Sequence, residues 1–285
     1  MNGFSNPFDA EDIIDGLREK DDEHIHLAES ALALANLTIP DRSAERYVQH
    51  LNKMSQEVGE RYSDLIESGS ADDGATKLAA IKHILYDKYG YDGDRDHYDH
   101  LQNANLMQVI DRRKGMPIAL SILCIHVGRV NGWSVKALNF PAHVVCRIED
   151  QGEIHLFDPF NQCKLLEAAD LRSYLKTLVS PNAELSSAHY NIATNRQLLI
   201  RLQNNIKLRQ IEAEDYDSAI ATIETMRKVA PDEYGLLFDS GVIYARLGKP
   251  LAALRVLETY MEKAISEEDK DDAFYLIEQI RKMLN

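Results

Sequence analysis

The 285-residue sequence contains only three cysteines and one tryptophan, and it lacks any long apolar run. The cysteines form no Cys-x-x-Cys pair, which argues against a disulfide framework or a zinc ribbon and predicts reduced thiols. No apolar stretch approaches the length needed to span a bilayer. The acidic, polar N-terminus also lacks the basic start and apolar segment of a signal peptide. We therefore expect a cytoplasmic protein without a membrane partner.

Positive charge is also scarce, because 32 Lys and Arg residues face 46 Asp and Glu residues, giving a formal net charge of −14. Such a field repels phosphate backbones, and affinity for nucleic acid depends on neutralising several phosphates. The best basic patch is only Arg112, Arg113 and Lys114, so nucleic acid is not expected as a partner. The hydrophobic content of 45% is enough to bury a sizeable core.

The sequence predicts helices in the first quarter of the chain. Apolar residues recur at three- and four-residue spacing after Pro40, which predicts an amphipathic helix within the helical region 21–67. Small and acidic residues at 67–75 predict a loop. A further helix is expected at 77–89, ended by Gly90.

The loop 91–100 is crowded with carboxylates and imidazoles. Its alternating aspartates imitate the start of an EF-hand loop, but His97 replaces the required sixth glycine and Asn103 the final glutamate. The EF-hand interpretation therefore fails. A looser metal site using His97 and His100 stays open, although a solvated loop is the favoured interpretation, and no metal or cofactor is predicted.

The middle of the chain changes from helix to strand. A helix is predicted from Pro117 to Asn131, because proline is well tolerated in a first helical turn. Three extended runs follow, and the last two, 143–148 and 153–158, are joined by a turn. Helices followed by consecutive strands predict an α+β fold with an antiparallel sheet.

The predicted hairpin brings an imidazole and a carboxylate to one face of the sheet. A two-residue turn at 150–151 places His143 opposite Asp158, and a turn at 151–152 leaves the pair diagonal on the same face. The same alternation sends Cys146 to the other face. A His–Asp pair can orient a catalytic base, but such pairs also occur as simple polar contacts, and a three-residue loop would separate them.

The C-terminal third repeats with a period of 34 residues, the length of a tetratricopeptide repeat. Shifting by that period superposes Ala219 on Ala253 and Ile223 on Leu257. Residues of the apolar, small and aromatic types that the repeat requires are Leu237, Gly241, Tyr244, Gly248 and Ala253. The predicted units are 200–233 and 234–267, with a capping helix near 270–283.

Four stretches together resemble a known family: "NANLMQVIDRRKGMPIALSIL", "FPAHVVCRI", "FDPFN" and "NRQLLIRLQNNIK". Their order is similar to the core of the transglutaminase-like superfamily, and with the repeats to a bacterial family of the invasion-regulator-associated SirB type. The resemblance implies a transglutaminase-like α+β core at 75–190, an N-terminal helical segment at 1–74 and tetratricopeptide-type helices at 191–285.

The resemblance also implies where a catalytic triad would lie. In the superfamily, a cysteine at a helix N-terminus, a histidine and an aspartate act in acyl transfer or amide hydrolysis. His143 and Asp158 match the last two, but Pro117 occupies the place of the cysteine. The SirB-type family generally has proline there too. It commonly reads Pro-Gly-His before the strand, where this chain has Ala142, and the added methyl group is expected to narrow access beside His143.

Three other residues are candidates for a displaced nucleophile. Ser121 lies one turn beyond Pro117, Cys124 lies on nearly the same face about 10 Å deeper, and Cys163 follows Asp158 in a loop. A helix N-terminus lowers a thiol pKa only within the first turn, where none of them lies. None of them reproduces the arrangement of the superfamily.

Polar residues ahead of the helix suggest a ligand-binding groove, namely Asn103, Asn105, Arg112 and Arg113 together with Pro117. An arginine beside a His–Asp pair can bind a carboxylate with two hydrogen bonds, as at a peptide terminus. Local salt bridges between Asp111 and the arginines are the favoured alternative.

The leading hypothesis is a non-catalytic transglutaminase-like protein that binds a protein or peptide, since repeat helices offer a concave surface. The competing hypothesis is a hydrolase or acyltransferase in which His143 and Asp158 act with a nonstandard nucleophile or an activated water.

Overall fold

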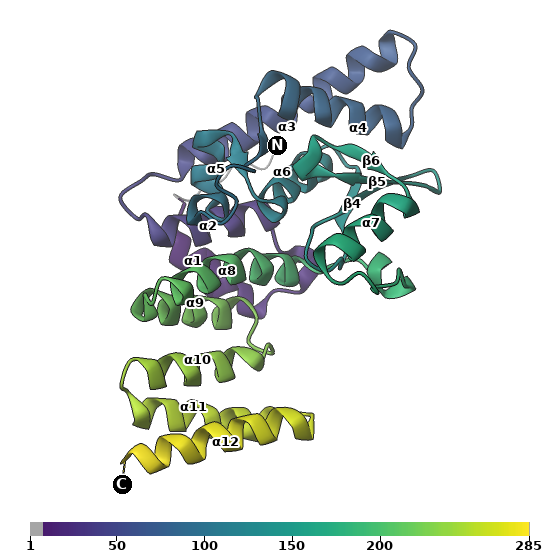
Figure 1. Cartoon of the computed structure of the whole chain (residues 1–285). Helices are drawn as coiled ribbons and strands as arrows, with labels where there is room; N and C mark the ends of the chain where they lie inside the picture. The colour runs from purple at the N-terminus through teal and green to yellow at the C-terminus, as the bar shows by residue number, and fades with distance from the viewer. Residues whose placement is uncertain (1–7, 285) are drawn as a thin grey trace. The chain divides into compact units, whose positions relative to one another are not determined.

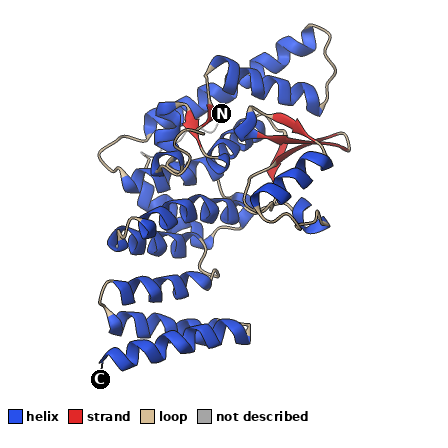
Figure 2. Cartoon of the chain, viewed as in Figure 1, coloured by secondary structure: helices blue, strands red, loops and turns tan. Residues whose placement is uncertain are grey.

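The computed structural model describes residues 8–284, which form two compact units (Figure 1). The first unit is Asp21–Leu202 with the described residues before Ile14, and the second is Ile14–Lys20 with the chain from Gln203 onward. Helices predominate and the strands form two small sheets (Figure 2), so the predicted α+β class is confirmed. Across residues 8–284, every helix is too short or too polar to cross a lipid bilayer.

The helices before the sheet follow the apolar spacing of the sequence. They are α1 (Ala10–Asp15), α2 (Leu27–Thr38), α3 (Glu45–Glu67), α4 (Gly74–Lys82), α5 (Leu106–Arg112) and α6 (Pro117–Val130), with 3-10 turns η2 (Asp22–His24) and η4 (Leu101–Asn103). In α3 the regularly spaced Tyr47, Leu51, Met54 and Val58 are buried, as the periodicity predicts.

The helix expected at 77–89 starts three residues earlier, because the Asp73 side chain accepts a hydrogen bond from the backbone of Thr76. Its second half is a π-helix, η3 (His83–Lys88). Gly90 follows with φ of +71°, a left-handed conformation that ends the helix where the sequence predicts.

The main sheet is antiparallel, with strand order β3-β4-β5-β6. Its strands are β3 (Ser134–Ala137), β4 (Cys146–Asp150), β5 (Glu153–Asp158) and β6 (Lys164–Leu166). Asp150 pairs with Glu153, so the turn is Gln151–Gly152, the second of the two predicted registers. Both turn residues have positive φ, as a tight hairpin turn requires. A separate parallel pair joins β1 (Asp92–Gly93) to β2 (Lys114–Gly115).

One strand boundary differs from the prediction. The sequence predicts that residues 143–148 are extended throughout, but β4 begins only at Cys146. The residues before it turn, since the backbone N–H of His143 bonds to the carbonyl of Pro141 and Ala142 has φ of +58°. His143 therefore lies in a turn ahead of the strand.

Helices cover the two faces of this sheet. Helix α6 packs closely on β3, because Gly128 has no side chain: a Cβ there would lie 2.3 Å from a methyl carbon of Val135. The opposite face carries a buried cluster with α7 (Ala168–Leu178), made of Leu138, Phe140, Val145, Leu166, Leu171 and Leu175. The chain then continues through the 3-10 turn η6 (Ser187–Tyr190) to α8 (Asn195–Glu212).

The second unit is helical and follows the predicted repeats. Beyond α8 it contains α9 (Tyr216–Val229), α10 (Gly235–Arg246), α11 (Pro250–Lys263) and α12 (Glu267–Leu284), with the 3-10 turn η1 (Gly16–Glu19). Within it, Gly241 of α10 allows close approach of Leu257 in α11, since an added Cβ would lie 2.5 Å from that side chain. A small residue is therefore required at this repeat position.

Candidate functional site

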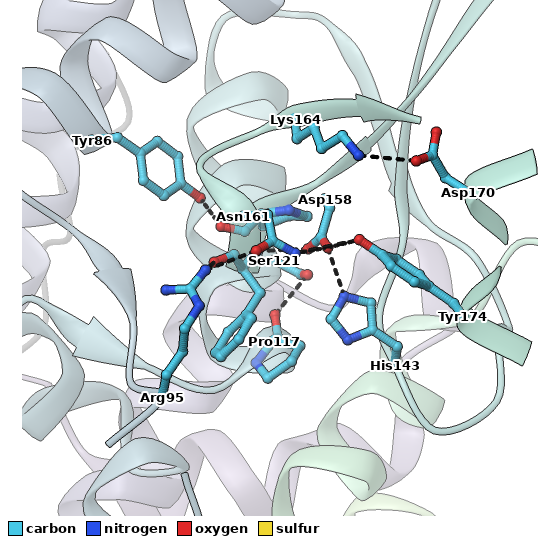
Figure 3. Close-up of polar contacts among 12 residues, drawn as sticks. Tyr86, Arg95, Pro117, Ser121, His143, Asp158, Asn161, Lys164, Asp170 and Tyr174 are labelled. Carbon is cyan, nitrogen blue, oxygen red and sulfur yellow. Dashed lines mark hydrogen bonds and ion pairs between the residues drawn. The ribbon is translucent and has the colours of Figure 1, made fainter. Parts of the chain in front are cut away.

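His143 and Asp158 meet in the core of the first unit (Figure 3). The Nε2 atom of His143 lies 2.9 Å from Oδ2 of Asp158. Both residues are buried, with 8% and 0% of their surfaces exposed. The structure thus brings together the two residues that the sequence singles out, although His143 reaches Asp158 from a turn and not from a strand.

The Asp158 carboxylate accepts four hydrogen bonds. Besides His143, Oδ2 accepts from Asn161 Nδ2 at 2.6 Å and from the Tyr174 hydroxyl at 2.8 Å. Oδ1 accepts from the backbone N–H of Phe160 at 2.9 Å, which caps the 3-10 turn η5 (Pro159–Asn161). Burial alone would raise the pKa of Asp158, but the side-chain hydrogen bonds outweigh burial and lower it, so the group is an anion at neutral pH.

Several side chains that sequence reasoning missed hold this arrangement in place. Arg201 of α8 donates to the carbonyl oxygens of Phe140 and His143, which fixes the turn that carries the imidazole. Arg95 donates to Asn161 Oδ1 at 2.8 Å, and so orients the amide that bonds to Asp158. The quoted "NRQLLIR" segment contains Arg201, but no spacing rule connects it to a turn 58 residues away.

Aromatic rings surround the imidazole. The ring of Tyr174 lies edge-on at 5.1 Å between centroids and that of Phe160 at 6.2 Å. Burial raises the pKa of the Tyr174 phenol, and the hydrogen bond from its hydroxyl to Asp158 raises that pKa further. Tyr174 therefore positions both members of the His–Asp pair.

Pro117 opens α6 beside this network and is buried. Its carbonyl accepts a hydrogen bond from the Ser121 hydroxyl at 2.8 Å, so the Ser121 proton is directed along the helix. Within residues 8–284, no serine or cysteine side chain is hydrogen-bonded to His143. Chemically, the pair can hold and move a proton.

The other two candidate nucleophiles lie next to each other. Cys124 Sγ is 3.8 Å from Cys163 Sγ and 3.5 Å from the Tyr86 hydroxyl, which in turn donates to the carbonyl of Pro159. All three cysteines are buried and free. Burial raises the pKa of Cys163 and of Cys146 well above the usual thiol range. These are core thiols.

The residues predicted to line a ligand groove are engaged internally. Asn105 caps α5 by accepting from the backbone of Gln108, and Asn103 Oδ1 accepts from Arg112 at 2.8 Å. Arg112 also pairs with the buried Asp94. Arg113, with φ of +59°, donates to the Tyr91 hydroxyl.

The favoured local salt bridges exist with different partners from those predicted. Asp111 pairs with Arg42 in the turn before α3 and with Arg46 in its first turn, and not with Arg112 or Arg113. The 91–100 loop contains no metal-type cluster among the described residues. The His97 side chain is 75% exposed, and His100 caps η4 through its ring nitrogen.

Comparisons with known proteins agree with this architecture. The profile described as transglutaminase-like superfamily matches residues 45–204, and a tetratricopeptide-repeat profile matches 206–285. A UPF0162 protein of Xylella fastidiosa is 30% identical over 254 residues, covering 88% of each chain. Protein SirB1 of Salmonella typhimurium is 26% identical over 234 residues, covering 82% of this chain and 83% of SirB1.

Among solved structures, the crystal structure of menin with its binding site for Mixed Lineage Leukemia protein matches at a TM-score of 0.35 and 9% identity. It covers 95% of this chain and 74% of menin, and likeness at that level identifies no shared property. The profile matches and the bacterial relatives confirm the predicted resemblance to the transglutaminase-like superfamily and its SirB-type members.

Proposed function

Because this chain belongs to the transglutaminase-like superfamily, in the family of the UPF0162 and SirB1 proteins, we propose that its core is non-catalytic and that it is a cytoplasmic protein- or peptide-binding module with a regulatory or scaffolding role. The observation that carries the proposal is Pro117 at the place of the nucleophile. Proline has no reactive group, and its carbonyl is already bonded to Ser121.

The His–Asp pair has a sufficient structural explanation without catalysis. The four donors of Asp158 come from the turn before β4, the turn after β5 and helix α7. A buried carboxylate with all its hydrogen bonds satisfied joins these segments and rigidifies them. Both residues would therefore stabilise the fold even if the protein catalyses no reaction.

The repeat unit supports the binding role. Tetratricopeptide repeats generally bind other proteins, and stacked helix pairs present extended surfaces. On α12 the side chains of Phe274 and Tyr275 are 54% and 67% exposed. Exposed aromatic side chains are enriched at protein–protein contacts.

Turnover measurements test the non-catalytic part. Wild type and His143→Gln are compared on a panel of peptides, amides and acyl esters at neutral pH. We expect no hydrolysis or acyl transfer by either protein. Turnover by wild type that His143→Gln loses would overturn the proposal.

Partner capture tests the binding part. A protein captured by the wild-type chain should still be captured by His143→Gln but not by Tyr275→Ser, with Lys282→Ser on the same helix as the matched control. Loss of capture with His143→Gln alone would place binding at the transglutaminase-like core. Equal capture by all variants would contradict binding through the exposed aromatic face of α12.

A hydrolase is the second candidate, and one observation favours it. If Nε2–H of His143 donates to Asp158, then Nδ1 carries the lone pair of a general base. Such a base can activate a water molecule without a protein nucleophile. In that case hydrolysis would be lost in His143→Gln while Cys124→Ser, Cys163→Ser and Ser121→Ala retain it.

A further inference from the structure

A pocket of about 400 Å³ lies in the first unit, where the N-terminal end of α2, the first half of α3 and the last turns of α6 meet. Neither His143 nor Asp158 lines it. Pockets of a few hundred Å³ with apolar walls and a few polar groups are the usual form of small-molecule sites. The site is therefore independent of the His–Asp pair and of the proposed function.

The walls of the pocket are largely apolar. The buried residues that line it are Ile25, Leu27, Ala28, Leu32, Leu51 and Ile125, and Val48 is half-buried. A water molecule occupies about 30 Å³ in the liquid, so the volume equals that of about 13 waters. A compound with about as many non-hydrogen atoms, such as a dipeptide, is of the right size.

One residue that lines the pocket has a polar atom without a partner among the described residues. Nε2 of His126 is buried without a hydrogen bond to any described residue. Burial, followed by the charges of His26 and Arg129, lowers the pKa of His126 to about 4, so the imidazole is neutral at pH 7. An unsatisfied buried polar atom is costly, and a small rotation of the ring towards the pocket would let its Nε2–H tautomer donate to a ligand atom.

Two further groups in the pocket favour a ligand that carries a carboxylate. Arg129 lines the pocket and donates to Asn195 Oδ1 through one guanidinium nitrogen, so that, among residues 8–284, its other amino group is left for a ligand. Residues Leu27, Ala28 and Glu29 form the first turn of α2, and its N-cap residue makes no side-chain capping bond. The first-turn N–H groups of a helix have no intrahelical acceptor and attract anions.

Negative charge is also present, since Glu23 and Glu29 line the same pocket. A plain carboxylic acid would meet repulsion from them, whereas a ligand that also carries an ammonium group would find a partner of each sign. We propose that the pocket binds a zwitterionic apolar dipeptide, with its carboxylate at Arg129 and His126, its ammonium group at Glu23 or Glu29, and its side chain against Leu32, Leu51 and Ile125.

Calorimetry of the full chain with three related probes tests the charge requirement. The probes are L-leucyl-L-alanine, its N-acetyl derivative and its C-terminal amide. We expect the zwitterion to bind and each capped derivative to bind at least about tenfold more weakly, because each loses a charge-assisted hydrogen bond. No binding of the zwitterion at millimolar concentration, or equal binding of either capped derivative, would overturn the proposal.

Two variants locate the binding. Arg129→Gln should lower the affinity for L-leucyl-L-alanine at least about tenfold and leave the affinity for the C-terminal amide unchanged. Val48→Trp should abolish binding of the dipeptide, because the larger side chain fills the pocket. Arg172→Gln on the exposed face of α7 is the matched control and should bind as wild type. Thermal melting checks that each variant is folded, and His143→Gln should retain full affinity. Wild-type affinity in either a folded Arg129→Gln or a folded Val48→Trp would show that this pocket is not the site.

Discussion

The carboxylate of Asp158 accepts a hydrogen bond from the imidazole of His143 at 2.9 Å, and both side chains are buried. The two residues are brought together by a turn before β4 and the last residue of β5, with Arg201 fixing that turn. The pair is thus built into the packing of the sheet and α7. Perturbing it should change stability whatever its chemical role.

We expect Asp158→Asn to lower the free energy of unfolding by about 2–4 kcal/mol at pH 7, because the buried network loses its negative charge and one accepting oxygen is replaced by a donor. The folded-state pKa of Asp158 is lowered, so its contribution is present above the unfolded pKa and is lost as pH falls through the folded pKa. The gap between variant and wild type should therefore narrow below about pH 4.

Urea unfolding followed by circular dichroism at pH 7 and pH 3.5 measures both effects. The exposed Asp41→Asn is the control and should stay within about 0.5 kcal/mol of wild type. Tyr174→Phe removes one of the four hydrogen-bond donors to Asp158 and should lower the free energy of unfolding by about 1 kcal/mol. An Asp158→Asn variant as stable as wild type would show that the network contributes nothing net.

The thiols should be unreactive in the folded protein. All three cysteines are buried, and burial raises the pKa of Cys146 and Cys163, so thiolate is scarce at neutral pH. We expect iodoacetamide to label each cysteine slowly at pH 7.5 and all three readily in urea, as peptide mass spectrometry would show. Rapid labelling of one cysteine in the folded chain would instead indicate an activated thiol and would contradict both the non-catalytic core and a hydrolase that uses only activated water.

Stability should also depend on pH through His50. Burial, followed by the nearby Arg113 charge, lowers the pKa of His50 from 6.5 to about 4. Between these values the unfolded chain binds more protons than the folded one, so stability falls as pH decreases from 6.5 towards 4. After allowance for solvent screening, this contribution is on the order of 1 kcal/mol.

A His50→Gln variant should therefore show a shallower loss of stability between pH 6.5 and 4 than wild type. His24→Gln, at an exposed histidine whose nearest acidic partner is exposed too, is the matched control for the chemical change from histidine to glutamine. Chemical denaturation at several pH values gives the slopes. Identical slopes for His50→Gln and wild type would mean that His50 protonates equally in both states.

The features that follow local rules are the ones that the sequence predicts well. The spacing of apolar residues predicts α3, and a proline in the first turn predicts the start of α6. The 34-residue period predicts the repeat helices. The Gln151–Gly152 turn fixes one of the two predicted registers, and Gly152 adopts the positive φ that the turn requires without steric cost. The apolar spacing, the proline and the turn lie within a few residues of the feature that they determine or within the same helix, and the repeat period is contained in one continuous segment of the chain.

The parts that were missed depend on contacts between distant segments. Spacing cannot show that Cys124 and Cys163 are neighbours, since a helix and a loop meet only after folding. In the same way Arg112 pairs with Asp94 through the β1–β2 contact, although Asp111 is its sequence neighbour. Alternation along the sequence predicts that His143 lies on a strand, whereas Arg201 holds it in a turn.

A small residue at position 241 is the clearest packing requirement of the repeat unit. A Cβ on Gly241 would lie 2.5 Å from Cδ2 and Cγ of the fully buried Leu257, so α10 and α11 must separate or Leu257 must move. We expect Gly241→Ala to lower the free energy of unfolding by about 1–3 kcal/mol, because overpacking outweighs the gain in helix propensity. Gly235→Ala is the matched control: its Cβ would meet only Glu233, at 3.7 Å, and it should be neutral or slightly stabilising. Urea unfolding of both variants decides the point, and a Gly241→Ala protein as stable as Gly235→Ala would show that this helix pair adjusts without cost.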